Sequence, residues 1–414
     1  MLMTSKTYCG NLLWHLNLLA FGKQVMTAVL MCLAIACAFP LLAESGAAWQ
    51  QADFAAELYR HATKNPGENV VISPWSVANL FALLQTGARG GTAKGISSAL
   101  RLGALGDGSF SAAKTFREAR ADLACATNRD VVLELSDSLW LATGFRINPE
   151  FAALAGDAFD AEIRSTEMGA KGRTTINAFV KDRTHGRIEN LIEPPVLNSR
   201  DTCLVAVDTV YLKAQWQVPF MKSATRERDF HAADGDSKAP FLHSAHHVEI
   251  LDAPECAALR LPYRSSTLEM LVVLPSGSNT LAEVEAKLSA KWLDRLAAAP
   301  WRGRADIALP KFDLGSEHDL KPILAPMGMD AAFDPIRADF GNIAPGRLYI
   351  GTAMQKANVT VDEEGTEASA AAYAVMERGG VRRLRSFIAD RPFLFLIRET
   401  RTGMVLFLGR VAKP

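Results

Sequence analysis

The chain has 414 residues, of which 49% are hydrophobic and 22% charged, and its 45 basic residues balance 45 acidic ones. This composition is that of an ordinary globular protein, long enough for one large domain or two. Because there is no basic excess, the composition does not point to a nucleic-acid-binding protein, and we expect no nucleic-acid partner.

The N-terminal segment is more apolar than the rest of the chain. Residues 25–42 are almost entirely apolar, Lys23 lies just before them, and Ala43 ends a small-residue cleavage pattern. We therefore expect residues 1–43 to be a signal peptide or N-terminal hydrophobic segment of a protein that is secreted or extracytoplasmic, in the extracellular space or the periplasm. An uncleaved membrane anchor, a lipoprotein attached at Cys37 and a start codon further along stay open.

The cysteine pattern does not indicate a disulfide framework. Three of the six cysteines precede residue 44. The other three, Cys125, Cys203 and Cys256, cannot all pair, and a domain of this size does not need disulfides. We expect them to be buried free thiols.

Helical patterns dominate the first half of the chain after residue 49. Apolar spacing predicts a helix over 52–62, then a short strand over 70–73. Pro74 favours the first turn of a long helix, which the glycines of residues 87–91 end. That glycine cluster lacks the Gly-Lys-Ser/Thr ending of a phosphate-binding loop. Two further helices are predicted from Asn148 towards Phe159 and over 174–183.

Strand patterns dominate the second half. The continuous apolar run 203–212 indicates a strand covered on both faces. The chain ends with two apolar strands around a turn. This order predicts an α+β fold with large antiparallel or mixed sheets. The remaining predicted segments are strands over 131–142, 268–274, 305–309, 391–398 and 404–411, and an amphipathic helix over 281–296.

Residues 361–380 differ from every other stretch. They begin acidic, pass through Gly365 and continue as small residues, with no bulky apolar side chain until Tyr373. Such a segment cannot bury enough apolar area, so we expect it to rest as an exposed loop. As a strand, however, alternate residues from Thr366 onward would form one small apolar face. Gly365 would be the hinge, because glycine changes backbone conformation easily. A plain linker or an Ala-rich helix is the alternative.

Five motifs follow one another along the chain, and each is weak by itself. They are Asn69-Val-Val-Ile-Ser-Pro-Trp-Ser76, Val207-Asp-Thr-Val-Tyr-Leu-Lys-Ala-Gln-Trp216, Leu309-Pro-Lys311, Val361-Asp-Glu-Glu-Gly-Thr-Glu-Ala368, and Arg391-Pro-Phe393 with Phe407-Leu-Gly-Arg-Val411. In this order and spacing they resemble the serpin family. The resemblance implies one serpin domain over 49–414. Its α+β fold would have a large central β-sheet, two further sheets, about eight or nine helices and an exposed reactive-centre loop over about 363–388.

The resemblance also implies an inhibitory function. A serine protease would attack the loop and form an acyl-enzyme, and the freed loop would insert as a strand into the main sheet. The protease would be trapped in a covalent 1:1 complex with a monomeric inhibitor. No membrane association is expected unless the N-terminal segment is retained.

Counting along the loop gives the reactive bond that the resemblance implies. Seventeen residues from Glu363 place the cut after Gly379, and sixteen place it after Arg378, whose charge suits a trypsin-like pocket. We therefore expect cleavage at Arg378-Gly379. A count from the other end of the loop leaves further positions open, namely Met376, Val381, Arg382 and Arg383.

Two groups of residues would control insertion in a serpin-like chain. The hinge would comprise Glu363, Gly365, Thr366, Glu367, Ala368, Ser369, Ala370 and Ala371. The sheet-opening region would comprise Ser73, Ser76, Asp208 and Gln355. Serpins usually have Asn and His at the last two positions. Because a Gln amide can donate to a carboxylate, we expect the Asp–Gln pair to replace that hydrogen bond and to retune the opening barrier.

No catalytic or metal-binding constellation is evident. His243-Ser-Ala-His-His247 with Glu249 does not have the His-Glu-x-x-His order, and no second ligand cluster accompanies it. Pro275-Ser-Gly-Ser-Asn279 is not a nucleophile elbow. We therefore expect no enzyme, no metal and no cofactor. The alternatives are a non-inhibitory serpin such as a carrier or chaperone, a cross-class inhibitor of cysteine proteases, and an extracytoplasmic hydrolase.

Overall fold

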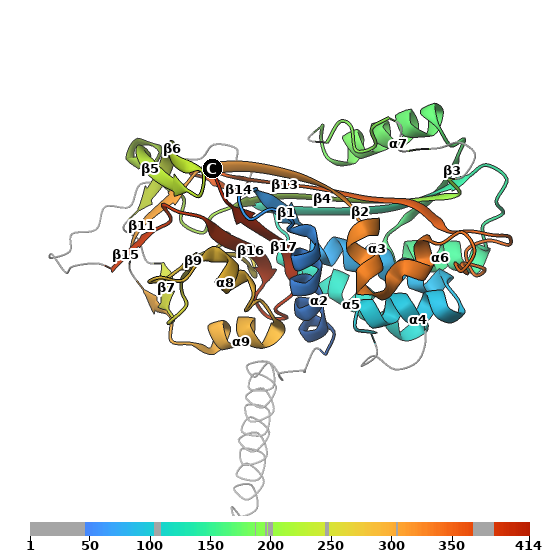
Figure 1. Ribbon diagram of the computed structural model, residues 1–414, viewed down its shortest axis with the longest axis horizontal. Helices are drawn as coiled ribbons and strands as arrows, with labels where there is room; N and C mark the ends of the chain where they lie inside the picture. Colours follow the sequence, from blue (N-terminus) through green and yellow to red (C-terminus); the bar gives the residue numbers. More distant parts are fainter. Residues whose placement is uncertain are drawn as a thin grey trace, which may run out of the picture. The chain divides into compact units, whose positions relative to one another are not determined.

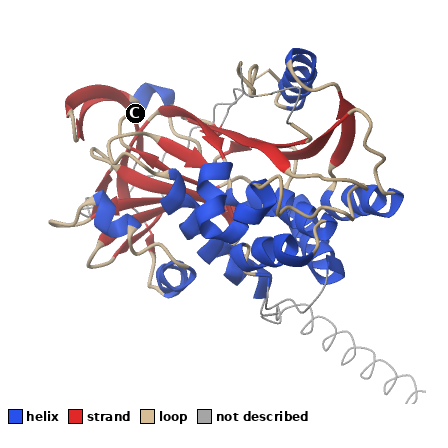
Figure 2. Cartoon of the chain, turned by 45° about the vertical axis from the view of Figure 1, so that its right-hand side comes forward, coloured by secondary structure: helices blue, strands red, loops and turns tan. Residues whose placement is uncertain are grey.

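The structure is a computed structural model. It contains nine α-helices and three β-sheets, of seven, six and four strands, within the residues that it describes (Figure 2). Helices and large sheets thus occur together, and the predicted α+β class is confirmed. Two compact units are distinguished, Met1–Ser45 and Gly46–Pro414, and the fold below is that of the second. The described residues are 46–102, 109–186, 188–194, 197, 202–244, 248–303, 305–366 and 385–414.

Helix α3 (Pro74–Gly87) is the central helix and is buried along almost its whole length. Its start follows from local sequence: the Ser73 side chain accepts a hydrogen bond from the Ser76 amide, and Pro74 occupies the first turn. It follows α2 (Gly46–Ala62) and β1 (Val70–Ile72), as predicted.

The predicted end of the long helix is confirmed, but two helices that follow it were not predicted and a later boundary is wrong. Helix α3 ends at Gly87, Gly90 then begins α4 (Gly90–Ala99), and α5 (Ser109–Ala126) follows it. The single helix expected over 281–296 is two helices, α8 (Leu281–Glu285) and α9 (Ala290–Ala298). The break arises because Ser289 accepts a hydrogen bond from the Trp292 amide and so caps a new helix.

The seven-stranded sheet contains the C-terminal hairpin, which is confirmed. Its strands, in spatial order, are β1, β17 (Val405–Val411), β16 (Phe393–Glu399), β9 (Leu268–Pro275), β8 (Cys256–Pro262), β7 (Glu249–Asp252) and β10 (Arg302–Gly303). Every residue of β9, β16 and β17 is buried, as expected for strands that form the centre of a core.

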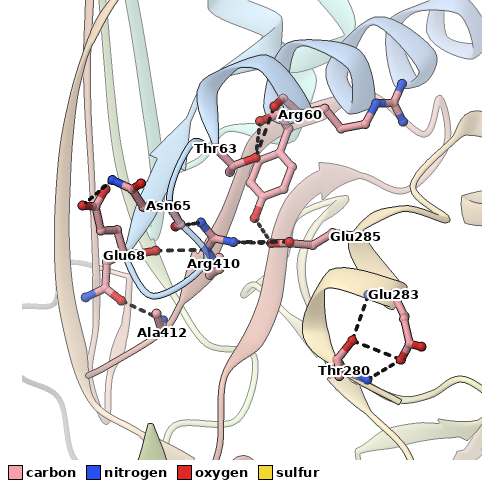
Figure 3. A network of polar contacts seen from close by, with 11 residues as sticks. Arg60, Thr63, Asn65, Glu68, Thr280, Glu283, Glu285, Arg410 and Ala412 are labelled. Carbon is pink, nitrogen blue, oxygen red and sulfur yellow. Dashed lines mark hydrogen bonds and ion pairs between the residues drawn. The ribbon is translucent and has the colours of Figure 1, made fainter. Parts of the chain in front are cut away.

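Arg410 ties the end of this sheet to two other segments (Figure 3). Its guanidinium donates to the Glu285 carboxylate of α8 at 3.0 Å and to the backbone oxygens of Asn65 and Glu68. Tyr59 of α2 donates to the same carboxylate at 2.7 Å. The buried arginine therefore joins three parts of the chain that lie far apart in sequence: its own strand β17, the turn before β1, and α8.

The six-stranded sheet is covered on both faces. Helix α7 (Ala170–Arg183) lies on one face, and α3 lies on the other with α5 and α6 (Pro149–Phe159) (Figure 1). The strands, in spatial order, are β12 (Phe312–Asp319), β13 (Ile350–Val361), β14 (Gly365–Thr366), β4 (Leu204–Gln215), β2 (Val131–Ala142) and β3 (Glu162–Thr166).

Alternate residues of β4 belong to two separate cores. Leu204 and Ala206 pack in the larger core, which contains the buried side chains of α3, whereas Val205 and Val207 pack in the smaller core beneath α7. A continuous apolar run is the sequence that such a doubly covered strand requires.

The remaining elements complete the fold. The four-stranded sheet has the order β15 (Arg385–Ile388), β11 (Ala305–Pro310), β6 (Gly235–Ser244) and β5 (Arg226–Ala232). Short helical turns are α10 (Lys321–Leu324), Lys222–Ala224, Ala325–Met329 and Asp330–Phe333.

The cysteines differ in exposure. Cys256 is buried and Cys203 half-buried, but Cys125 near the end of α5 is exposed, so the expectation of burial is wrong for Cys125. The expected N-terminal hydrophobic segment, residues 1–43, lies outside the described residues. Among the helices that are described, none combines the length and apolarity that a bilayer span requires.

Candidate functional site

The stretch expected to rest as an exposed loop begins inside the six-stranded sheet. Val361 ends β13, the chain reverses, and Gly365–Thr366 returns as the two-residue strand β14. Thr366 pairs with Val361 on one side and with Ala214 of β4 on the other. The expectation of an exposed loop is therefore wrong for residues 361–366. The reversal is stabilised by the Asp362 carboxylate, which accepts hydrogen bonds from the amides of Glu364 and Gly365.

Gly365 is required by close packing. Its φ angle is not positive, so the native state does not use the conformational freedom expected of a hinge glycine. Instead, a Cβ at this position would overlap the backbone oxygen of Ala214. The absent side chain lets β14 approach β4 closely enough to pair with it.

An aromatic stack supports Thr366. Its side chain is only 1% exposed, and its hydroxyl lies 2.7 Å from the hydroxyl of Tyr263. Tyr263 stacks on Trp216 with a centroid distance of 4.9 Å. The Trp216 indole nitrogen donates to the backbone oxygen of Asp362 at 3.0 Å. Burial raises the pKa of Tyr263, so its hydroxyl stays protonated beside Thr366.

Two acidic residues, Glu363 and Glu364, connect the chain reversal between β13 and β14 to neighbouring segments. Glu363 accepts hydrogen bonds from Lys311 at 2.8 Å and Thr225 at 2.7 Å. Burial alone would raise the pKa of Glu363, but these two partners outweigh burial and lower it. Glu364 pairs with Lys222 at 2.6 Å. Lys311 belongs to the Leu309-Pro-Lys311 motif, so two of the sequence motifs meet at this point.

The other loop residues predicted from the sequence lie outside the described part of the chain. These are Glu367, Ala368, Ser369, Ala370 and Ala371 of the hinge, and Arg378 and Gly379 of the reactive bond. The described chain resumes at β15, which pairs in parallel with β11.

Beyond β14, strands β13 and β4 pair directly and in parallel, and this pairing is called the seam below. Its register places Gln355 beside Asp208. The Gln355 amide nitrogen donates to Asp208 Oδ2 at 2.7 Å. The same side chain exchanges two 3.0 Å hydrogen bonds with the backbone of Ser73, and the Ser76 hydroxyl donates to Asp208 Oδ1. The structure thus brings together all four residues of the predicted sheet-opening region.

Two further residues of this cluster were missed by sequence reasoning. Asp137 of β2 lies directly opposite Asp208, and the Asn79 amide of α3 donates to Asp137 Oδ2. Asn79 follows Ser76 by three residues, so the two share one face of α3. An Asp within the apolar run 131–142 was the available signal, because a buried carboxyl group needs specific partners.

Both carboxyl groups are shifted towards their protonated forms. Burial raises the pKa of Asp137 to about 7, although hydrogen bonding from Asn79 and the charge of Arg120 lower it in part. Burial and the neighbouring Asp137 raise the pKa of Asp208 well above its usual range. Two carboxyl groups that share one dry site cannot both ionise readily.

Other candidate chemistry finds no support in the described residues. His243 pairs with Asp306 at 2.9 Å on the exposed side of β6, while His246 and His247 lie outside the described residues. No group of three or more potential metal ligands occurs among the residues that the structure describes. The site therefore allows a conformational change. The two-residue strand β14 already lies at one end of the seam, and a longer strand could extend from it between β13 and β4.

The chain was compared with known proteins. The family model described as Serpin (serine protease inhibitor) matches residues 50–414. Glia-derived nexin of Mus musculus is 34% identical over 361 residues, which is 84% of this chain and 88% of the relative. Leukocyte elastase inhibitor of Sus scrofa is 32% identical over 380 residues, 87% and 97% of the two chains. The crystal structure of native protease nexin-1 with heparin superposes with a TM-score of 0.79 at 29% identity, covering 89% and 100% of the chains.

Proposed function

Because the chain belongs to the serpin family, we propose that it inhibits a serine protease as a suicide substrate. The family and its fold were predicted from the sequence, and both are confirmed. The single observation that carries the proposal is β14. Gly365–Thr366 already lies between β13 and β4, so the residues that follow can continue the same strand down the seam.

Strand geometry gives the size of the resulting displacement. Insertion of about 14 residues at about 3.3 Å each would form a strand of about 45 Å. A protease linked as an acyl-enzyme to the end of that strand would be carried along the sheet. Since a misplacement of about 1 Å can slow a reaction by about a hundredfold, a displacement of tens of ångströms would leave the ester unhydrolysed.

The target class follows from the loop sequence and from one relative. Arg378 favours a trypsin-like protease, because its guanidinium suits a pocket with a buried carboxylate. The Sus scrofa relative is named for inhibition of leukocyte elastase, which makes elastase-like proteases the second class to examine. Cysteine proteases and a non-inhibitory function remain alternatives.

We also propose that the active protein is an exported monomer without its N-terminal segment. Residues 1–43 would be removed on export, and residues 49–414 would act as one monomeric domain, with a reactive-centre loop over about 363–388. The compact unit that begins at Gly46 and the family match over residues 50–414 support this division.

The proposal is tested by mixing the protein with trypsin, an elastase-like protease and a papain-like protease. We expect a covalent complex that survives denaturing gel electrophoresis with at least one serine protease. Mass spectrometry of the released C-terminal fragment is expected to place the cut at Arg378-Gly379. If every protease that cuts the loop leaves only cleaved protein, the inhibitory proposal is wrong.

A hinge variant shows whether insertion is what traps the protease. Thr366→Arg places a charge at a site that is 1% exposed, so β14 should no longer stay between β13 and β4 to start the inserted strand, and the variant should be cleaved without forming a complex. Thr400→Arg, in an exposed turn, is the matched control and should still form it. Equal complex formation by both variants would contradict insertion from β14.

A further inference from the structure

Asp137 and Asp208 form a buried carboxyl pair at the centre of the six-stranded sheet. They are direct cross-strand partners in the antiparallel β2–β4 pairing, and both are almost inaccessible to solvent. Their positions alternate with Val207 and Trp140, which face α7, so both carboxyl groups face α3. Directly opposed side chains on one face of an antiparallel pair have Cβ atoms about 5 Å apart.

Only three of the four carboxyl oxygens of this pair have a hydrogen-bond partner among the described residues. Asp208 accepts from Ser76 and from Gln355, whereas Asp137 accepts from Asn79 through Oδ2. Asp137 Oδ1 is buried and has no hydrogen-bond partner within the described ranges. A proton held between the two carboxyl groups would supply the missing donor, while a second negative charge would leave two anions together in a dry site.

The pair adjoins the seam that must open for insertion. The bond from Gln355 to Asp208 crosses from β13 to β4, whereas the Asp137–Asp208 pairing lies wholly on the far side of the seam. Separating β13 from β4 would break the first contact, keep the second, and admit water to the pair. Opening would therefore relieve the cost of a buried negative charge.

We propose that Asp137 and Asp208 act as a proton-controlled latch, which keeps the seam closed while the pair holds its proton and lets it open when the proton is lost. The inference rests on the proposed function, because opening of the seam matters for loop insertion. The latch makes insertion pH-dependent and faster in a neutral to alkaline medium than in an acidic one.

Charged groups around the pair are few. Arg120 of α5 and Asp160, which caps α6, act on Asp137 in opposite directions. The neighbouring face of α3 contributes the uncharged Ser76 and Asn79. On β12, His318 is the register partner of Gln355, but its Nε2 is bound to the backbone oxygen of Val71.

The direction of the pH effect follows from the pair. Burial raises the pKa of Asp137 to about 7 and that of Asp208 well above its usual range, so the closed sheet holds more protons than an opened one. The stability that the pair gives to the closed state is therefore complete at low pH and is lost as pH rises through about 7. Burial lowers the pKa of His318, so protonation of His318 would act in the opposite direction and favour opening at low pH.

The test is amide hydrogen exchange of β13 and β4 between pH 5 and 8.5, corrected for the intrinsic effect of pH on exchange. We expect protection of the seam amides to fall by about tenfold per pH unit as pH rises to about 7, where opening releases one proton, and to level off once the closed pair has lost that proton. The double variant Asp137→Asn with Asp208→Asn keeps an acceptor oxygen at both positions but can ionise at neither, so its protection should not fall with rising pH. Asp229→Asn, at a side chain that is 61% exposed and lies on β5, is the matched control and should keep the slope.

A flat wild-type profile, or the same fall in the double variant, would overturn the latch. If the double variant does not fold, infrared spectra of the wild-type protein decide the question. A protonated carboxyl band present at pH 6.5 and lost by pH 8.5 is expected, and its absence at pH 6.5 would overturn the proposal. Neither measurement uses a protease, so failure of protease trapping and failure of the latch are separate results.

Discussion

At the scale of single residues, Gly365 determines whether the loop begins inside or outside the sheet. Any side chain at this position meets the backbone of Ala214, which cannot move without disturbing β4. We expect Gly365→Ala to lower the free energy of unfolding by about 1–3 kcal/mol, the range for an overpacked site. The measurement is the denaturant midpoint of the intact protein.

Gly67→Ala is the matched control for this prediction. Gly67 lies in an exposed turn, and an added Cβ would meet nothing within 4 Å. Its substitution should change the free energy of unfolding by no more than about 0.5 kcal/mol. Equal effects at the two glycines would show that β14 is not packed against β4 in solution.

At the scale of elements, Arg410 joins β17, α8 and the turn before β1. Its side chain is 3% exposed and Glu285 is 13% exposed, so Arg410→Met would leave a nearly buried carboxylate without its cation. We expect a loss of about 3–5 kcal/mol in unfolding free energy. Lys413→Met, which breaks an exposed pair with Asp234, should cost no more than about 1 kcal/mol. Similar midpoints for the two variants in denaturant unfolding would contradict this account.

Elements were predictable where hydrophobic pattern and capping agree. The boundaries predicted for 131–142 coincide with β2, and Asn148 caps α6 through the Glu150 amide. Helix α4 was missed because its buried residues, Thr92, Ile96 and Ala99, present only a narrow apolar face. The segment 281–296 was read as one helix because its apolar spacing continues across the break at Ser289.

The candidate site was predictable only in part, because some of its contacts depend on strands that are distant in sequence. The motifs indicated Ser73, Ser76, Asp208 and Gln355, and their hydrogen bonds are present in the structure. The partner Asp137 depends on the register of two strands separated by about 70 residues, which no local pattern reveals. The pairing of β14 depends likewise on the backbone of Ala214, so a segment with the composition of a loop begins as a strand.

At the scale of the whole molecule, inhibition by loop insertion requires a native state that is not the most stable one. Beyond β14, β13 pairs directly with β4, so no third strand lies between the two strands there. Insertion would add ladder hydrogen bonds and bury more of the loop. The native form would then persist because a kinetic barrier, including the Asp208–Gln355 contact, keeps the seam closed.

The most direct measurement is the thermal unfolding midpoint before and after one cut within residues 367–384, made by a protease that is not trapped and verified by mass spectrometry. About a dozen new ladder hydrogen bonds at about 1 kcal/mol each should raise the midpoint by on the order of 10 °C or more. Cleaved Thr366→Arg should show a smaller rise. A midpoint that is unchanged or lower after cleavage of the wild-type protein would contradict the claim that this loop becomes a strand.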